Sequence, residues 1–138
     1  MTVEIFSDGA SRGNPGVSAI AFMILSTDGQ LLTRYSKYVG VRTNNQAEYE
    51  ALIAALQSAT ALHLQEVVCH LDSELIVKQL TGEYRVKNPV LKHLWKIVQD
   101  LKKHFHQITF KHVSREDRHI KEVDRLANQT LNNVRNSL

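Results

Sequence analysis

The order of its secondary-structure patterns is the feature that most limits what this chain can fold into. Residues 2–7 alternate as a strand that ends at a glycine-rich turn over 8–16, and two more strand patterns follow at 17–25 and 31–39. After these strands the pattern changes to helix, strand, two helices, strand and helix. An antiparallel meander followed by this alternation predicts an α/β fold, in which a mixed sheet is covered by helices on both faces.

Helix-start signals bound the later elements. Thr43 followed by Gln46 three positions later is a capping box, Ser73 is a suitable N-cap, and Pro89 suits a first turn. The predicted elements are a helix that opens at Thr43, a strand at 66–71, helices at 74–80 and 89–104, a strand at 107–113, a polar loop at 114–119 and a helix at 120–136. No linker divides them, so we expect a single domain over residues 1–138.

Composition excludes several classes of protein. No segment is long and apolar enough to cross a membrane, and no leader precedes the first strand, so we expect a soluble cytoplasmic protein. The single cysteine, Cys69, lies in an apolar strand and is interpreted as a buried thiol. The net charge is +3, with basic residues concentrated from Arg85 onward. This charge suits a polyanionic partner and equally a solvated basic face.

Glu48 is an acid at a position where apolar packing is expected. In a helix that opens at Thr43, it shares a face with Leu52 and Ala55. An ionised carboxylate removed from water costs several kcal/mol unless a cation meets it. Glu48 therefore either reaches solvent at the rim of the core or faces a cation.

Three more acids occupy unusual positions. Asp8 and Asp72 each follow directly after an apolar strand, and Asp124 shares a helix face with Ala127 and Leu131. A right-handed crossover through the helix after Thr43 makes the first strand and the 66–71 strand parallel neighbours. Because sites form at the carboxyl edge of such sheets, we expect these acids and Glu48 to meet there.

Each acid also has a structural alternative, in which Asp8 forms an Asx turn, Asp72 caps a helix and Asp124 pairs with Arg118 or Lys121. Gathered together, two such charges about 4 Å apart repel by about 4 kcal/mol at an effective dielectric near 20. No lysine or arginine is a close same-face neighbour on the two helices, so divalent cations are the expected counter-charge. Ligation by oxygen alone favours Mg²⁺ or Mn²⁺ over Zn²⁺.

Four motifs occur in order over essentially the whole chain. They are Asp8-Gly9-Ala10-Ser11 continuing to Gly13-Asn14-Pro15-Gly16, Thr43-Asn44-Asn45 with Ala47-Glu48, Asp72-Ser73, and Asp124-Arg125-Leu126-Ala127-Asn128. Together they resemble type 1 ribonuclease H. The resemblance implies a five-stranded mixed sheet and an endonuclease that cleaves the RNA strand of RNA–DNA hybrids, leaving 5′-phosphate and 3′-hydroxyl ends. It also implies two Mg²⁺ ions, for which Mn²⁺ substitutes, held by the catalytic residues Asp8, Glu48, Asp72 and Asp124.

The same resemblance implies the substrate contacts. The residues that match positions reading the RNA strand or the minor groove are Gly9, Asn14, Asn44 and Asn45. The residues that match a pocket for a phosphate of the DNA strand are Thr43 and Asn88. Asn14 is also a good turn residue, and Thr43 is already explained as a cap.

The chain departs from the best-known bacterial pattern at two places. Between Leu80 and Trp95 there is no room for an extra helix and basic loop, which leaves Arg85 and Lys87 as a short substitute and predicts weaker, more salt-sensitive binding. The mobile histidine of some members is replaced by a loop in which Arg118 and His119 are equal candidates for an auxiliary role. Because fewer residues are available to bind the DNA strand, double-stranded RNA remains an alternative substrate.

An alternative function is a module that binds RNA–DNA hybrids without cleaving them. Loss of one acid would favour that module, and all four acids are present. We expect a monomer, because no exposed apolar stripe remains once the helices are placed.

Overall fold

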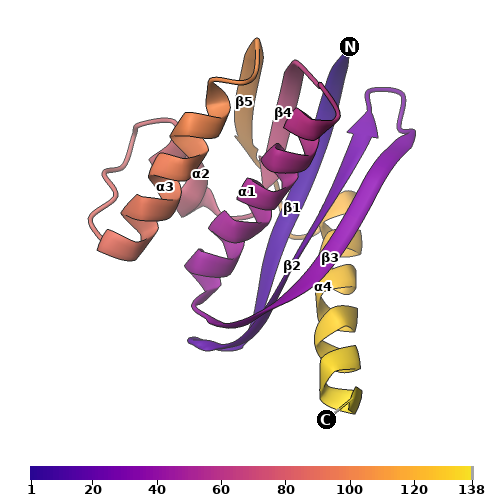
Figure 1. Ribbon diagram of the computed structural model, residues 1–138, viewed down its shortest axis with the longest axis vertical. Coiled ribbons are helices and arrows are strands. Elements are labelled where there is room, and N and C mark those ends of the chain that lie inside the picture. Colours follow the sequence, from indigo (N-terminus) through magenta and orange to yellow (C-terminus); the bar gives the residue numbers. More distant parts are fainter. Residues whose placement is uncertain (138) are drawn as a thin grey trace.

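The computed structural model describes residues 1–137, in which one five-stranded sheet carries helices on both faces (Figure 1). Every strand and helix expected from the sequence is present. The elements are β1 (Thr2–Gly13), β2 (Gly16–Ser26), β3 (Leu31–Arg42), α1 (Asn44–Ala61), β4 (Glu66–Leu71), α2 (Glu74–Leu80), α3 (Pro89–Lys102), β5 (Gln107–His112) and α4 (Arg118–Ser137).

The sheet has the strand order β3-β2-β1-β4-β5. The β1–β2 and β2–β3 pairs are antiparallel, whereas the β1–β4 and β4–β5 pairs are parallel. The crossover that contains α1 therefore places β4 beside β1, which confirms the predicted mixed sheet and its parallel pair.

Two hydrophobic cores lie on opposite faces of the sheet. Ile5 and Phe22 belong to the core shared with α1, α2 and α3, while Phe6 and Met23 belong to the core shared with α4. Successive strand residues point to opposite faces, so a strand covered on both sides is apolar on both, as β2 is from Ala19 to Leu25. Cys69 is fully buried in β4, and this burial raises the pKa of its thiol, in agreement with the prediction of a buried thiol.

The first strand is longer than predicted. β1 continues past Asp8 to Gly13, and Asp8 pairs with Ala21 of β2. The glycine-rich segment was expected to be a turn, but its backbone completes a ladder with β2, and only Asn14 and Pro15 connect the two strands. β3 is also longer than expected and reaches Arg42.

The last helix begins two residues earlier than predicted. Asp117 Oδ1 accepts hydrogen bonds from the backbone N–H groups of His119 and Ile120, at 2.9 and 3.1 Å. Asp117 therefore holds the first turn of α4. As a result, Arg118 and His119 lie in that helix and not in the loop before it.

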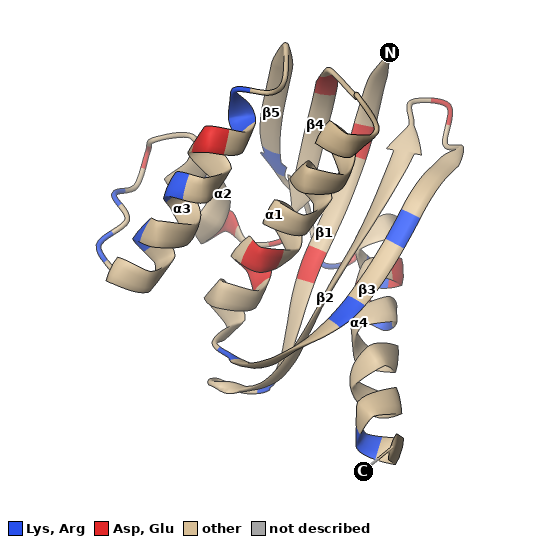
Figure 2. Cartoon of the chain, in the orientation of Figure 1, with Lys and Arg blue, Asp and Glu red and all other residues tan. Residues whose placement is uncertain are grey.

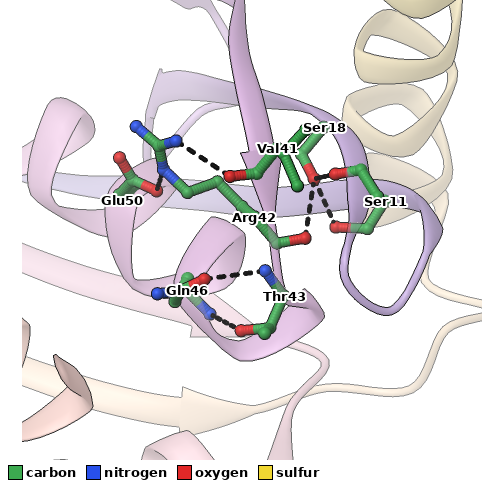
Figure 3. Close-up of polar contacts among 8 residues, drawn as sticks. Ser11, Ser18, Val41, Arg42, Thr43, Gln46 and Glu50 are labelled. Atoms are coloured by element: carbon green, nitrogen blue, oxygen red, sulfur yellow. Dashed lines mark hydrogen bonds and ion pairs between the residues drawn. The ribbon is translucent and has the colours of Figure 1, made fainter. Parts of the chain in front are cut away.

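A network of polar contacts fixes the junction between β3 and α1 (Figure 3). Thr43 Oγ1 accepts from Gln46 N at 3.2 Å while Thr43 N donates to Gln46 Oε1 at 2.8 Å, which confirms the capping box. Arg42 Nε lies 2.7 Å from Glu50 Oε2, and the buried Ser18 hydroxyl donates to the Arg42 carbonyl at 3.3 Å. These contacts set the start of α1 and so the direction of every side chain in its first turns.

Two expectations about the surface have different outcomes. In residues 1–137 no helix lies between α2 and α3, so the compact form without an added basic helix is confirmed, and Figure 2 shows basic residues along that connection.

The expected absence of an exposed apolar stripe is wrong, because the edge strand β3 exposes Leu31, Tyr35 and Val41. No helix within residues 1–137 has the length and apolar character needed to span a membrane.

Candidate active site

A cavity of about 520 Å³ lies where β1, the start of α1, the end of β4 and the first turns of α4 converge. Its lining includes all four acids singled out in the sequence, namely Asp8, Glu48, Asp72 and Asp124. These residues are far apart in the chain, so folding alone gathers them, and the acidic positions of β1 and α1 lie close together in Figure 2.

Three of the acids form a tight cluster, which we call the buried triad: Asp8, Glu48 and Asp72. Each contributes a carboxylate oxygen, and these oxygens lie within 4.8 Å of one another. Asp8 lies in β1 and Asp72 directly follows β4, its parallel neighbour. Glu48 projects toward them from the second turn of α1 and is buried, as its position on an apolar face predicts.

Gly9 allows α1 to pack this closely against β1. A Cβ atom at residue 9 would lie 2.4 Å from the carbonyl carbon of Ala47 and 2.6 Å from the backbone nitrogen of Glu48. The Gly9 N–H instead donates a hydrogen bond to Glu48 Oε1 at 3.0 Å. Gly9, predicted as a substrate contact, thus also orients one carboxylate of the triad.

The triad is electrostatically costly without a cation. Burial, followed by the neighbouring Glu48, raises the pKa of Asp8 far above its ordinary range. Burial also raises the pKa of Glu48 to about 7, although a hydrogen bond with Asp8 opposes the shift. At neutral pH the pair therefore retains a proton when no metal is present. Burial raises the pKa of Asp72 as well, and Arg115 acts in the opposite direction.

The donor set fits a divalent cation. Glu48 Oε2 is buried and has no hydrogen-bond partner within residues 1–137, so one oxygen of the triad is unused by the protein. Such a group requires a partner, and three clustered carboxylate oxygens are ligands that Mg²⁺ and Mn²⁺ prefer.

The structural alternatives for Asp8 and Asp72 are wrong. Asp8 is paired within a strand, so it does not form an Asx turn. Ser73 is the N-cap of α2, because its Oγ accepts from Ile76 N at 3.2 Å. Asp72 is therefore free to point its carboxylate into the cavity.

Asp124 differs from the triad. The buried stripe of α4 consists of Ile120, Val123, Ala127 and Leu131, whereas Asp124 is exposed, so its predicted place on that stripe is wrong. One residue of rotation, about 100°, separates it from Val123 and turns it to the cavity. Its Oδ1 accepts from Asn128 Nδ2 at 3.2 Å, and its charge contributes to the raised pKa of Asp8.

The structural alternative for Asp124, an ion pair with Arg118 or Lys121, is also wrong. Within residues 1–137, neither Arg118 nor Lys121 lies within ion-pair distance of Asp124. Lys121 Nζ instead pairs with Glu116 Oε2 at 2.7 Å.

Arg115 is a basic residue of the cavity that sequence reasoning did not assign to the site. Its Nε lies 3.6 Å from Asp72 Oδ2, and its side chain lines the cavity. Among the described residues, the two expected auxiliaries do not line it: Arg118 is exposed, and the His119 ring packs on Phe6 with centroids 4.6 Å apart. The sequence signal that could have identified Arg115 is its position just after the last strand, at the carboxyl edge of the sheet where the acids were expected.

Four of the six predicted substrate contacts line a second cavity, also of about 520 Å³, whereas Gly9 and Asn44 line the acid cavity. The lining of the second cavity includes Asn14, Thr43, Asn45 and Asn88, and Asn45 lines the acid cavity as well. Asn14 Oδ1 accepts from the backbone N–H of Asn44 at 3.1 Å.

Two helices begin at this second cavity. Asn88 Oδ1 caps α3 by accepting from Val90 N and Leu91 N at 2.9 and 3.0 Å, and Thr43 caps α1. Gln46, the partner of Thr43 in the capping box, also lines the cavity and was not predicted as a contact.

A mixed sheet in the order β3-β2-β1-β4-β5, with acids from β1, α1, the end of β4 and α4 around one cavity, defines the ribonuclease H class of fold. A family model described as "Reverse transcriptase-like" matches residues 6–130, and the chain belongs to that family.

Similar proteins include the "Ribonuclease HI" of Halobacterium salinarum, which is 37% identical over 96% of this chain. The "Bifunctional protein Rv2228c" of Mycobacterium tuberculosis is 38% identical over 95% of this chain. The chain spans only 65% of the first relative and 36% of the second.

Solved structures show the same likeness. The crystal structure of RNase H1 from Halobacterium salinarum matches with a TM-score of 0.90, covering 96% of this chain and 99% of that one. LC11-RNase H1, solved in complex with an RNA/DNA hybrid, matches with a TM-score of 0.90 at 36% identity, covering 96% and 98%.

Proposed function

We propose that this chain is a metal-dependent endoribonuclease that hydrolyses the RNA strand of RNA–DNA hybrids. The observation that carries the proposal is the buried triad, whose carboxylate oxygens lie within 4.8 Å of one another beside the fourth acid, Asp124. The likeness to LC11-RNase H1, a protein solved with an RNA/DNA hybrid, supports the choice of substrate.

The four acids act as ligands of two Mg²⁺ ions in this proposal, and Mn²⁺ substitutes for Mg²⁺. When bound, such ions activate the attacking water and stabilise the leaving 3′ oxygen, which leaves a 5′-phosphate on the product. The protein's contribution is to hold the carboxylates at fixed positions on β1, α1, β4 and α4. The fold thereby presents to an anionic phosphodiester an acid-lined cavity, whose negative charge bound metal ions would offset.

Arg115 takes the auxiliary role that the sequence left between Arg118 and His119. Its guanidinium lies at the cavity, 3.6 Å from Asp72, on an exposed side chain that can turn to a phosphate oxygen. Guanidinium groups recognise phosphate through paired N–H donors. We therefore assign to Arg115 a contact with the phosphate at the point of cleavage.

The second cavity receives a phosphate of the DNA strand. Two helix N-termini reach it, capped by Thr43 and Asn88, and the positive end of a helix dipole favours anions. Asn14, Asn44 and Asn45 lie between the two cavities or beside them, where they can contact both strands of a bound hybrid. One chain supplies every one of these groups, which supports the expectation of a monomer.

The test is one panel of labelled substrates: RNA–DNA hybrid, double-stranded RNA, single-stranded RNA and duplex DNA. Each is incubated with Mg²⁺, with Mn²⁺ and with excess EDTA. We expect the RNA strand of the hybrid to be cut with either metal and no cleavage in EDTA. Cleavage that persists in EDTA contradicts the proposal, as does an intact hybrid in the presence of both metals.

The same panel separates the remaining alternatives. Cleavage of double-stranded RNA at a rate similar to the hybrid identifies an enzyme of relaxed specificity. Tight hybrid binding without cleavage identifies a binding module.

A further inference from the structure

The end of β5 holds Asp72 from both sides. The carbonyl oxygen of Leu71, just before Asp72, accepts from the backbone N–H of Val113 at 2.8 Å. The carbonyl oxygen of Asp72 itself lies 3.2 Å from His112 Nε2. Because a carbonyl oxygen only accepts, the His112 ring donates this hydrogen bond through its Nε2–H.

The two carbonyls belong to the two peptide planes that flank the Cα atom of Asp72. Restraining both planes restrains the backbone angles between them, and thereby the direction of the Cα–Cβ bond that leads to the carboxylate. The first plane is held by main-chain pairing, which any residue at position 113 other than proline can supply. The second plane depends on a side chain, that of His112.

The neighbouring helix leaves the Asp72 carbonyl free for this contact. α2 takes its first backbone acceptor from Ser73, whose carbonyl accepts from Val77 N at 3.1 Å, and its cap from the Ser73 hydroxyl. The carbonyl of Asp72 is one residue too early to join the helix ladder. The His112 ring, at the end of the parallel neighbour strand, reaches it from 40 residues away in the sequence.

We propose that His112 is a positioning residue for the metal site, which aims the Asp72 carboxylate at the buried triad by anchoring the Asp72 carbonyl. This inference rests on the proposed function, since it assigns to His112 a part in metal binding. Groups that orient a metal ligand commonly affect metal affinity even though they do not touch the ion.

The proposal is tested by Mn²⁺ calorimetry on the metal-free protein, without nucleic acid. Four variants are compared with the wild type: His112→Ala, His112→Asn, His112→Gln and, as a matched control, His106→Ala, which changes another exposed histidine just before β5. The amide nitrogen of glutamine can reach the place of Nε2, whereas that of asparagine reaches only the place of Nδ1. The expected result is about fivefold weaker Mn²⁺ binding for the alanine and asparagine variants and about wild-type binding for the glutamine variant and the control.

Thermal unfolding in EDTA provides the second readout. Because His112 is exposed, we expect the Tm of each variant to stay within about 2 °C of the wild type. Unchanged Mn²⁺ affinity in His112→Ala, or a glutamine variant as weak as the alanine variant, overturns the proposal. A wild type that binds Mn²⁺ but leaves the hybrid intact overturns the proposed nuclease activity and not the role of His112.

Discussion

The buried triad and Asp124 line one cavity but are held in different ways. Asp8 is 4% and Glu48 8% exposed, and both lie on elements that pack in the cores, whereas Asp124 lies exposed on α4 with Asn128 beside it. Charge in the triad therefore destabilises the metal-free fold, while water screens the charge of Asp124. Acids with the same proposed chemical role therefore have a stability cost at one part of the site and almost none at the other.

Replacing single acids gives the largest expected effects. Asp8→Asn and Asp124→Asn each remove one ligand charge with little change of volume, and each should lower turnover on the hybrid by about 10²-fold or more. In EDTA at pH 7.5, Asp8→Asn should raise the free energy of unfolding by about 2–4 kcal/mol, because the buried pair no longer has to retain a proton. Asp124→Asn should leave it unchanged within about 0.5 kcal/mol. Denaturant unfolding measures both.

Equal changes in stability for these two variants would break the comparison, since they would mean that burial does not separate the triad from Asp124. Turnover close to that of the wild type in Asp8→Asn would remove Asp8 from the catalytic site.

Gly9→Ala tests how closely α1 must approach β1. The added methyl group would meet backbone atoms of Ala47 and Glu48 at 2.4 and 2.6 Å, and backbone cannot move aside cheaply. We expect a loss of about 1–3 kcal/mol in the free energy of unfolding, together with weaker metal binding as Glu48 is displaced. Ala10→Gly, at the next residue, is the control, because it changes backbone flexibility in β1 without adding a methyl group. A fully stable and active Gly9→Ala would show that α1 need not lie so near the triad.

Arg115→Ala and Arg118→Ala are a matched pair of charge removals from the same region. Arg115 contacts Asp72 and lines the cavity, so its loss should lower kcat/KM by about tenfold, whereas loss of the exposed Arg118 should change it by less than about twofold. Steady-state kinetics at fixed ionic strength measure both. The opposite order would return the auxiliary role to the first turn of α4.

The smallest expected effect is a dependence on pH. The pKa of Glu48 is raised from 4.5 to about 7 in the folded protein, so its contribution to stability is fully present below pH 4.5 and is lost as the pH rises through about 7. The metal-free protein should therefore become less stable between these values, and a divalent metal should restore stability above them.

Mn²⁺ binding at neutral pH should also release about one proton, measured by calorimetry in buffers of different ionisation enthalpy. Metal binding without proton release would contradict a shared proton in the triad.

Much of the fold was predictable because local patterns and packing agree. The apolar run of β2, the capping box at Thr43 and the Ser73 cap are local signals, and the structure confirms each of them. The parallel pairing of β1 and β4 followed from the handedness of crossovers, which predicts from the sequence alone that Asp8 and Asp72 are neighbours.

The wrong or missing predictions share one cause, which is that a local sequence pattern does not show how separate elements pack. The segment after Asp8 was expected to be a turn from its glycines, but pairing with β2 overrode that local preference. Asp124 was placed on the apolar stripe from spacing alone, although a helix buries only the face that its partner sheet covers. Arg115 and His112 were missed because loops and strand ends carry no periodic signal that would relate them to Asp72.

The positions of the acids, the helix starts and the strands buried on both faces could all be read from the sequence, because these features depend on neighbours within a few positions. The packing of separate elements brings three carboxylates together, leaves the fourth exposed, and places Arg115 and His112 in contact with Asp72. Such distances depend on how separate elements pack, and a shift of one residue in register or 100° around a helix changes them while leaving the local pattern intact.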